Sequence, residues 1–226
     1  MLSGLAEFAL SQNGITGTIP HFVGMMTAMR DLFLQQNFFS GTIPSEFGRL
    51  SNAEMVGLHT NRLTGPMPTE IGLMSNVTSL RLSNNFLTSL PTEITRIGGL
   101  KILELGSNSL NGNVFTDFGL LENLETLALN NNSFVGPIPT ELGLIEGLST
   151  LLLSDNSLTG NIPQELGSLI GEEQPLAAIT LEVNNLVGTV PAELCSLGVF
   201  NETLTAGLSF DCIANLCGCE WCACTG

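Results

Sequence analysis

Residues 124–142 read LETLALNNNSFVGPIPTEL, and residues 148–166 read LSTLLLSDNSLTGNIPQEL. Both segments carry apolar residues at their first, fourth and sixth positions and an asparagine at the ninth. Both continue with a glycine and then an Ile-Pro pair. The second segment begins 24 residues after the first (148 − 124 = 24), so the chain contains a repeated unit of that length. A period of 20–50 residues is typical of repeat proteins that stack one unit on the next.

The repeat extends along most of the chain. It aligns on eight asparagines separated by 24, 24, 24, 23, 24, 24 and 28 residues: Asn13, Asn37, Asn61, Asn85, Asn108, Asn132, Asn156 and Asn184. The positions eight, five and three residues before each asparagine are apolar in all eight repeats. Glycine follows four residues after the asparagine in every repeat but one, where Ser89 stands instead and the turn is one residue shorter. Phe115 replaces the proline of the fifth repeat.

The pattern predicts a short strand in each repeat. Alternating leucines place their side chains on one face of a strand, and a single strand cannot bury that face alone. Neighbouring repeats therefore stack and share a continuous core. An asparagine amide both donates and accepts hydrogen bonds, so we expect it to satisfy backbone groups of the turn and of the next coil.

With these residues in place, the sequence resembles the plant-type leucine-rich repeat, whose consensus is LxxLxLxxNxLxGxIPxxLGxL. The resemblance covers residues 2 to about 194. It implies a mostly β member of the α/β-solenoid class, a right-handed leucine-rich repeat superhelix of about eight 24-residue repeats. A concave parallel β-sheet, a second short strand and 3-10 or irregular convex turns are expected. We divide the chain into a solenoid, 1–194, and a Cys-rich C-terminal cap, 195–226; the cap resembles the tails of leucine-rich repeat proteins from diatoms and related algae.

The resemblance also implies a function. Plant-type members are receptor-kinase ectodomains, secreted inhibitors of pathogen enzymes and algal cell-surface proteins, and their shared activity is binding. We therefore expect a non-catalytic recognition module that binds a protein, peptide or glycan on its concave face. Its expected location is extracellular or the cell surface, with the lumen of an organelle as the alternative. A structural or assembly subunit of a cell wall or larger complex is the alternative function.

No catalytic or cofactor site is predicted. The two histidines, His21 and His59, have no Cys, Asp and Ser residues at a spacing that suggests a catalytic arrangement. The glycines follow the repeat and form turns, so no phosphate-binding loop is present. We predict neither a cofactor nor a bound metal.

Charge is distributed unevenly along the chain. The net charge is −15, from 21 acidic and 6 basic residues, and all six bases lie within the first 101 residues. The acidic C-terminal half argues against nucleic acid or an anionic membrane as its partner, because like charges repel. No stretch reaches eighteen apolar residues, so no membrane span is expected.

The first residues already follow the repeat. Leu2 and Leu5 occupy repeat positions, and the segment before Glu7 lacks the basic and apolar regions of a signal peptide. A solenoid that begins in this way has an uncovered apolar edge. We expect missing upstream sequence or a neighbouring molecule to cover it.

All six cysteines lie at the C-terminal end: Cys195, Cys212, Cys217, Cys219, Cys222 and Cys224. Six is an even number and permits fifteen disulfide pairings. The last four lie within eight residues and could instead bind zinc tetrahedrally. We favour disulfides, because three glycosylation sequons also fit an oxidising secretory route. The sequons begin at Asn76, Asn131 and Asn201.

An acidic residue stands two positions after the proline position in seven repeats. We call this set the acid row: Glu46, Glu70, Glu93, Asp117, Glu141, Glu165 and Glu193. Carboxylates in register could bind cations or a basic partner. The favoured interpretation is local, because an acid stabilises the positive N-terminal end of a short helical turn.

The strand positions between the leucines are predicted to face solvent on the concave side. Seven of these residues in the first half form what we call the front patch: Asp31, Phe33, Met55, His59, Arg81, Ile102 and Glu104. We expect the five central residues on adjacent strands, flanked by Asp31 and Glu104. Aromatic, Met and Arg side chains at the centre of a patch are typical of a binding hot spot. The front patch is therefore the predicted partner site.

Overall fold

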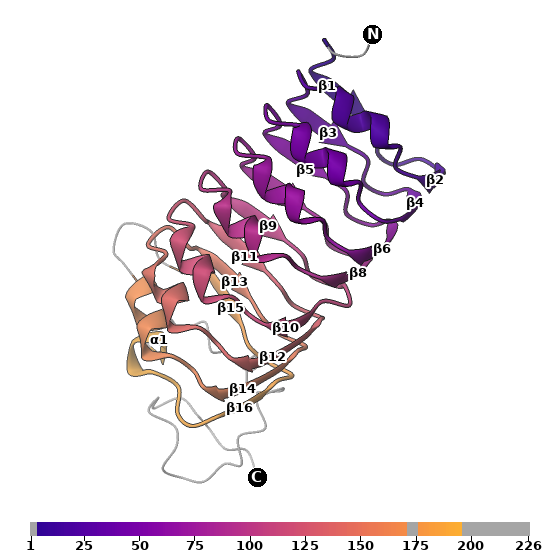
Figure 1. Cartoon of the computed structure of the whole chain (residues 1–226). Coiled ribbons are helices and arrows are strands. Elements are labelled where there is room, and N and C mark those ends of the chain that lie inside the picture. Colours follow the sequence, from indigo (N-terminus) through magenta and orange to yellow (C-terminus); the bar gives the residue numbers. More distant parts are fainter. Residues whose placement is uncertain (1–3, 171–175, 196–226) are drawn as a thin grey trace.

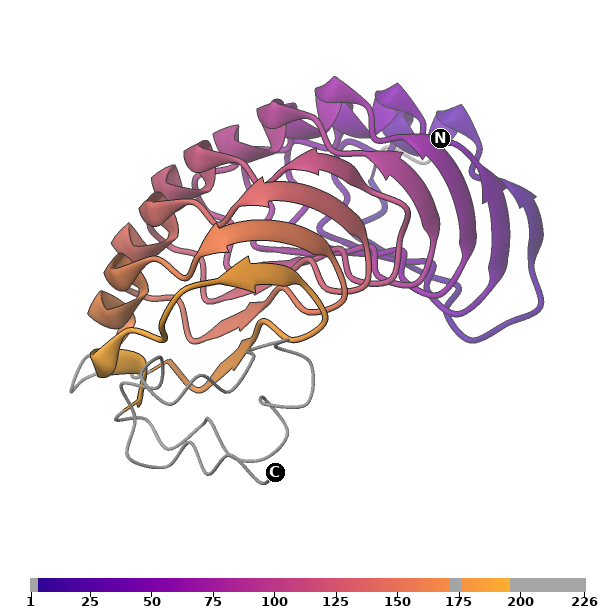
Figure 2. The same cartoon turned by 90° about the horizontal axis from the view of Figure 1, so that it is seen from below.

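The computed structural model describes residues 4–170 and 176–195. These residues form a curved stack of coils (Figure 1), and Figure 2 shows that the coils follow an arc with short helical turns along its outer rim. Each coil contributes one strand to a parallel sheet of eight strands, ordered as they occur along the chain. The strands are β1 (Glu7–Ala9), β3 (Asp31–Phe33), β5 (Met55–Gly57), β7 (Ser79–Arg81), β9 (Ile102–Glu104), β11 (Thr126–Ala128), β13 (Thr150–Leu152) and β15 (Ala178–Thr180). The predicted solenoid, mostly β, is confirmed.

A second strand follows the conserved asparagine in each coil, as expected. These strands are β2 (Thr16–Thr18), β4 (Phe38–Gly41), β6 (Arg62–Pro66), β8 (Phe86–Ser89), β10 (Asn111–Asn113), β12 (Ser133–Pro137), β14 (Ser157–Asn161) and β16 (Asn185–Val187).

The outer turns are 3-10 helices. They are η1 (His21–Met25), η2 (Ser45–Arg49), η3 (Thr69–Leu73), η4 (Thr92–Arg96), η5 (Thr116–Leu120), η6 (Thr140–Leu144) and η7 (Gln164–Leu169), and the last coil ends in the helix α1 (Ala192–Cys195). A residue in extended conformation precedes each 3-10 turn, and in six of the seven it is the repeat proline, whose fixed φ starts the turn. The seventh is Phe115, with φ −74° and ψ 133°, so the missing proline does not change the backbone there.

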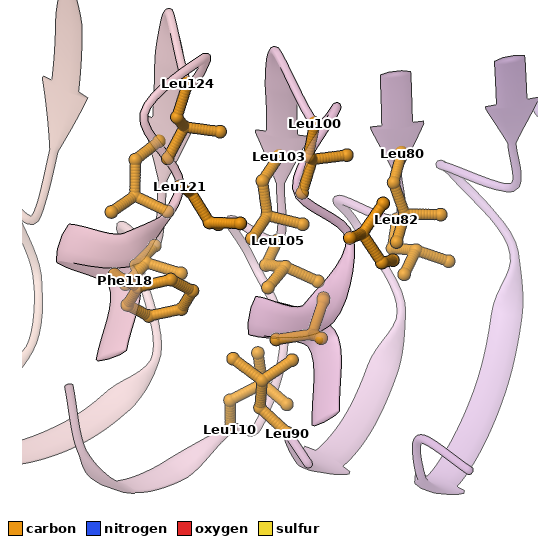
Figure 3. Close-up of a cluster of buried hydrophobic side chains, with 14 of the residues drawn as sticks. Leu80, Leu82, Leu90, Leu100, Leu103, Leu105, Leu110, Phe118, Leu121 and Leu124 are labelled. Atoms are coloured by element: carbon orange, nitrogen blue, oxygen red, sulfur yellow. The ribbon is translucent and has the colours of Figure 1, made fainter. Parts of the chain in front are cut away.

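The apolar repeat positions form one continuous core along the solenoid. In Figure 3 the leucines of neighbouring coils point into a common interior, and Leu80, Leu103 and Leu124 are essentially inaccessible to solvent. Full burial of a leucine side chain contributes about 1.5–3 kcal/mol. Because each coil buries its leucines only against the coils on either side, stacking is the main source of stability.

The conserved asparagines form a hydrogen-bonded ladder inside the stack. In the third repeat, the Asn61 Nδ2 group donates to the carbonyls of Leu34 and Leu58, both at 3.0 Å. The Oδ1 atom of Asn61 accepts from the backbone N–H of Phe39 in the preceding coil. Each asparagine from Asn37 onwards bonds the preceding coil in the same way. The predicted bonds to the asparagine's own turn are confirmed, but the other coil that the amide bonds is the preceding one and not, as predicted, the next.

The second layer of strands divides in two between β8 and β10, while the eight-stranded sheet continues without a break. In most coils the 3-10 turn carries a glycine packed against the next turn; a Cβ on Gly72 would lie 2.3 Å from the Glu93 carbonyl oxygen. The fourth coil has Thr95 at this position. η4 and η5 contact each other less extensively than the other pairs of successive 3-10 turns do. The shorter turn at Ser89 adds a register shift between β6 and β8.

Several predictions fall outside the described residues. These are the glycosylation candidate Asn201 and the cysteines from Cys212 onwards. Cys195 is the last residue of α1. Within 4–170 and 176–195, no helix has the length and apolar character needed to cross a bilayer.

Candidate functional site

The outward-facing residues of the eight-stranded sheet form two rows that run across the strands. One row contains Asp31, Met55, Ser79, Ile102, Thr126 and Thr150, and the other contains Phe33, Gly57, Arg81, Glu104, Ala128 and Leu152. Partners in adjacent strands are about 4.8 Å apart. We call the surface that these rows and the residues just after each strand form the concave surface.

The front patch is present on this surface, with its members on the adjacent strands β3, β5, β7 and β9 or, for His59, just after β5. Phe33 and Arg81 share a row, and Gly57 lies between them. Met55 lies in the other row, between Asp31 and Ser79. Ser79 separates Met55 from Ile102 in this row, and Glu104, on the outer strand β9, is the direct partner of Arg81.

Phe33 lies over Gly57, which has no side chain to obstruct it. A Cβ on Gly57 would lie 3.4 Å from the Phe33 ring and 2.7 Å from the Gln35 Oε1 atom, so both side chains lie over this glycine. Phe33 is consequently half-buried, and the Gln35 Oε1 atom is buried without a hydrogen-bonding partner. Sequence reasoning missed Gln35; the neighbouring glycine on the outward face was the available signal.

Three titratable residues of the front patch interact electrostatically. The Arg81 Nε atom lies 3.6 Å from the Glu104 Oε1 atom, and both side chains are partly exposed. His59 follows β5, and its Nδ1 atom lies 3.2 Å from the Thr60 hydroxyl. Burial lowers the pKa of His59 below 6.5; Glu104 acts in the opposite direction, and Arg81 lowers it further. Neutral His59 therefore prevails at pH 7, and the charges of this cluster belong to Arg81 and Glu104.

A hollow of about 330 Å³ adjoins Glu104 and extends from the residues that follow β7 to β13. Its lining residues are Ser83, Asn84, Glu104, Gly106, Ser107, Thr126, Ala128, Asn130, Thr150 and Leu152. Gly106 has no side chain and Ala128 has a small one, whereas the lining residues around them are larger. The surface is therefore hollow at these two positions. The sequence shows these small residues in outward positions, but the hollow was not predicted.

Other predicted features lie away from the hollow or beside it. Asn76 is exposed and donates to the Ser51 carbonyl at 2.8 Å. Asn131 is exposed beside the hollow, where its Nδ2 group donates to the Ser107 hydroxyl at 3.1 Å.

Six acid-row residues occur in the first turn of η2 to η7 and Glu193 in that of α1, as the local interpretation predicts. Among the described residues, no three His, Cys, Asp or Glu side chains gather in a way that could hold a metal ion.

Comparison with known proteins explains this geometry. The leucine-rich repeat family model matches residues 28–50, 76–97, 123–144 and 147–169. The ectodomain of the Arabidopsis thaliana receptor kinase GASSHO1/SCHENGEN3, solved with CASPARIAN STRIP INTEGRITY FACTOR 2, is 36% identical with a TM-score of 0.81 and covers 85% of this chain. This chain is a plant-type leucine-rich repeat protein.

Two further solved structures share the repeat architecture. The Arabidopsis receptor kinase HAESA, in complex with the peptide hormone IDA and the co-receptor SERK1, is 30% identical over 87% of this chain, with a TM-score of 0.79. The leucine-rich repeat protein LIC12759 of Leptospira interrogans is 34% identical over 84% of this chain, with a TM-score of 0.69. Among curated proteins, none has significant sequence similarity to this chain.

The leucine-rich repeat chain is shorter than these relatives. The aligned region spans 23% of the GASSHO1/SCHENGEN3 ectodomain, 32% of HAESA and 46% of LIC12759. What the two receptors bind is a property of those longer proteins. The comparisons establish the repeat type and an architecture that is used for binding.

Proposed function

We propose that this leucine-rich repeat protein is a non-catalytic recognition module that binds a peptide or protein partner on its concave surface, in an extracellular or cell-surface setting. The observation that carries the proposal is the Arg81–Glu104 ion pair beside the hollow. Together they place charged, polar and apolar groups at the middle of a rigid sheet. Rigid presentation keeps the entropic cost of binding low.

Two further features support this choice. Phe33 and Met55 provide partly exposed aromatic and thioether surface near Arg81, and such residues are enriched at the centres of protein interfaces. The two receptor relatives were both solved with a bound ligand, which for HAESA is a peptide hormone. A glycan ligand remains an outcome of the experiment below.

The test compares two double variants of the full chain as baits in native extracts, read by mass spectrometry. Phe33→Ala with Arg81→Ala alters the concave surface. Phe86→Ala with Arg62→Ala removes the same residue types from the second strand layer, where Phe86 is exposed and Arg62 stacks on Phe38. Matched circular dichroism and melting temperatures establish that both variants fold.

A partner that is lost from the concave variant and retained by the second variant supports the proposal. Retention by the concave variant contradicts it. Co-purification at fixed stoichiometry with neighbours that both variants retain would favour the structural or assembly role instead.

A further inference from the structure

We propose that the hollow is a binding site for a single basic side chain, Lys or Arg, of the peptide or protein partner. The inference rests on the proposed function and adds the chemistry of the ligand. It combines the shape of the hollow, the surroundings of Glu104 and the charge of the coils that the hollow spans.

The hollow has one charged wall and one apolar wall. Glu104, Ala128 and Leu152 share a row on three successive strands, so Ala128 lies between the carboxylate and the leucine. The distance from Glu104 to Leu152 is about 10 Å, twice the strand spacing. Long basic side chains place an aliphatic stem on apolar surface and a charged group at its end. A stem lying over Ala128 and against Leu152 would direct its charged group to Glu104.

The Glu104 carboxylate can accept a second cation. The Arg81 Nε atom lies 3.6 Å from its Oε1 atom, which is longer than the 2.7–2.9 Å of a strong charge-assisted hydrogen bond. The Oε2 atom of Glu104 has no hydrogen-bonding partner among the described residues. A ligand guanidinium or ammonium group can therefore bind Oε2 without breaking an existing strong hydrogen bond.

The rest of the lining supplies neutral polar groups. The side-chain amides of Asn84 and Asn130 and the hydroxyl of Thr126 make no hydrogen bond to the described residues, so these groups are available to the ligand backbone. Asn130 lies over Gly106, where a Cβ would lie 2.5 Å from its Oδ1 atom. This glycine keeps the amide against the surface and the hollow open.

The charge of the chain selects a basic ligand over an acidic one. Of the coils that the hollow spans, that of β7 carries Arg81 in its strand, whereas β9, β11 and β13 carry no basic residue, because no Lys or Arg occurs after Lys101. Asp155 and Glu182 follow β13 and β15 and add negative potential on the same side. Complementary potential across an interface provides specificity and faster association.

The probes are two synthetic peptides, acetyl-Gly-Gly-Arg-Gly-Gly-amide and the same peptide with citrulline in place of arginine. Citrulline keeps the shape of the side chain and removes its charge. Binding to the full chain is followed by NMR chemical-shift titration. We expect shifts at the Gly106 and Ala128 amides and an affinity for the arginine peptide about tenfold higher, which corresponds to about 1.4 kcal/mol. Equal affinity for both peptides, or shifts confined to other coils, would overturn the proposal.

Three variants localise the effect. Glu104→Gln should abolish the preference for arginine, and Ala128→Leu, which fills the hollow, should weaken both peptides. Glu125→Gln is the matched control, because Glu125 pairs with Lys101 at 2.7 Å and does not line the hollow. A preference for arginine that persists in Glu104→Gln contradicts the assignment.

The outcomes also separate this inference from the function on which it rests. If a natural partner binds the concave surface but the arginine preference is absent, the hollow does not select a basic side chain and the recognition function stands. If the natural partner proves insensitive to the Phe33→Ala, Arg81→Ala change, the recognition function fails, whatever the peptides show.

Discussion

The Asn61 Oδ1 atom accepts a hydrogen bond of 3.0 Å from the backbone N–H of Phe39, so a side chain of the third coil completes the turn of the second. Each coil from the second onwards has the same relationship to the coil before it. The asparagine thus couples adjacent repeats in addition to forming its own turn. This coupling explains why the stack behaves as one unit although each strand contains only three residues.

Asn61→Ala should lower the free energy of unfolding by roughly 2–3 kcal/mol, because it leaves buried backbone groups without partners. The matched control is Asn13→Ala. Asn13 is exposed, and among the described residues its side chain donates only to the carbonyls of Leu10 and Ser11 in its own coil. The control should cost less than about 1 kcal/mol, because water can replace those bonds. Denaturant unfolding of the two variants measures both values, and similar losses would argue against the coupling role.

Gly143→Ala should destabilise the solenoid by about 1–3 kcal/mol, as expected for overpacking a tight contact. A Cβ at this position would lie 2.2 Å from the Glu165 carbonyl oxygen, and a backbone atom cannot move aside without displacing η7. Gly98→Ala is the control, because nothing lies within 4 Å of the position of its Cβ. The denaturant midpoint should fall for the first variant and change little for the second. Equal midpoints would show that the contact between turns is not a limit on packing.

Much of the fold follows from local sequence, because each repeat carries its own strand, its asparagine and its proline. The 24-residue spacing alone predicts that Leu127 lies in the strand of its coil and that Asn132 follows that strand, and both are found there. The break beside β8 is different. It coincides with Thr95, which stands where the other 3-10 turns carry glycine, and the less extensive contact between η4 and η5 is seen only in the structure.

The candidate site was predicted less completely than the fold. The repeat register places Phe33, Arg81 and Glu104 in one outward-facing row, with Gly57 between Phe33 and Arg81. It does not show that Phe33 lies over Gly57, or that Gly106 and Ala128 leave a hollow beside Glu104. The direction of a side chain depends on the size of its neighbours across the strands. A repeat alignment identifies those neighbours but does not show how their side chains pack.

The C-terminal cysteines give a chemical prediction that does not depend on the described residues. We expect the six cysteines to form three disulfides, because their number is even and the sequons indicate an oxidising route. Mass spectrometry of the intact protein without reductant should then show the loss of six hydrogens relative to the reduced chain. Six free thiols, or a metal retained under native conditions, would favour the zinc alternative.

His59 should titrate with a pKa below 6.5, and its two charged neighbours should shift that pKa in opposite directions. Glu104→Gln removes an attraction for the imidazolium and should lower the pKa further, whereas Arg81→Gln removes a repulsion and should raise it. The NMR pH titration of the His59 ring proton measures all three values.

The same shift predicts how stability depends on pH. Because the folded-state pKa is lowered, the unfolded chain binds more protons at this site below pH 6.5. The stability that His59 contributes is therefore fully present above pH 6.5 and is lost as the pH falls towards the folded-state pKa. His59→Gln should remove this part of the pH dependence. In the NMR titration, shifts of the His59 pKa that have the same sign in Glu104→Gln and Arg81→Gln would mean that the three side chains do not form one electrostatic cluster in solution. The assignment of charges beside the hollow would then fail.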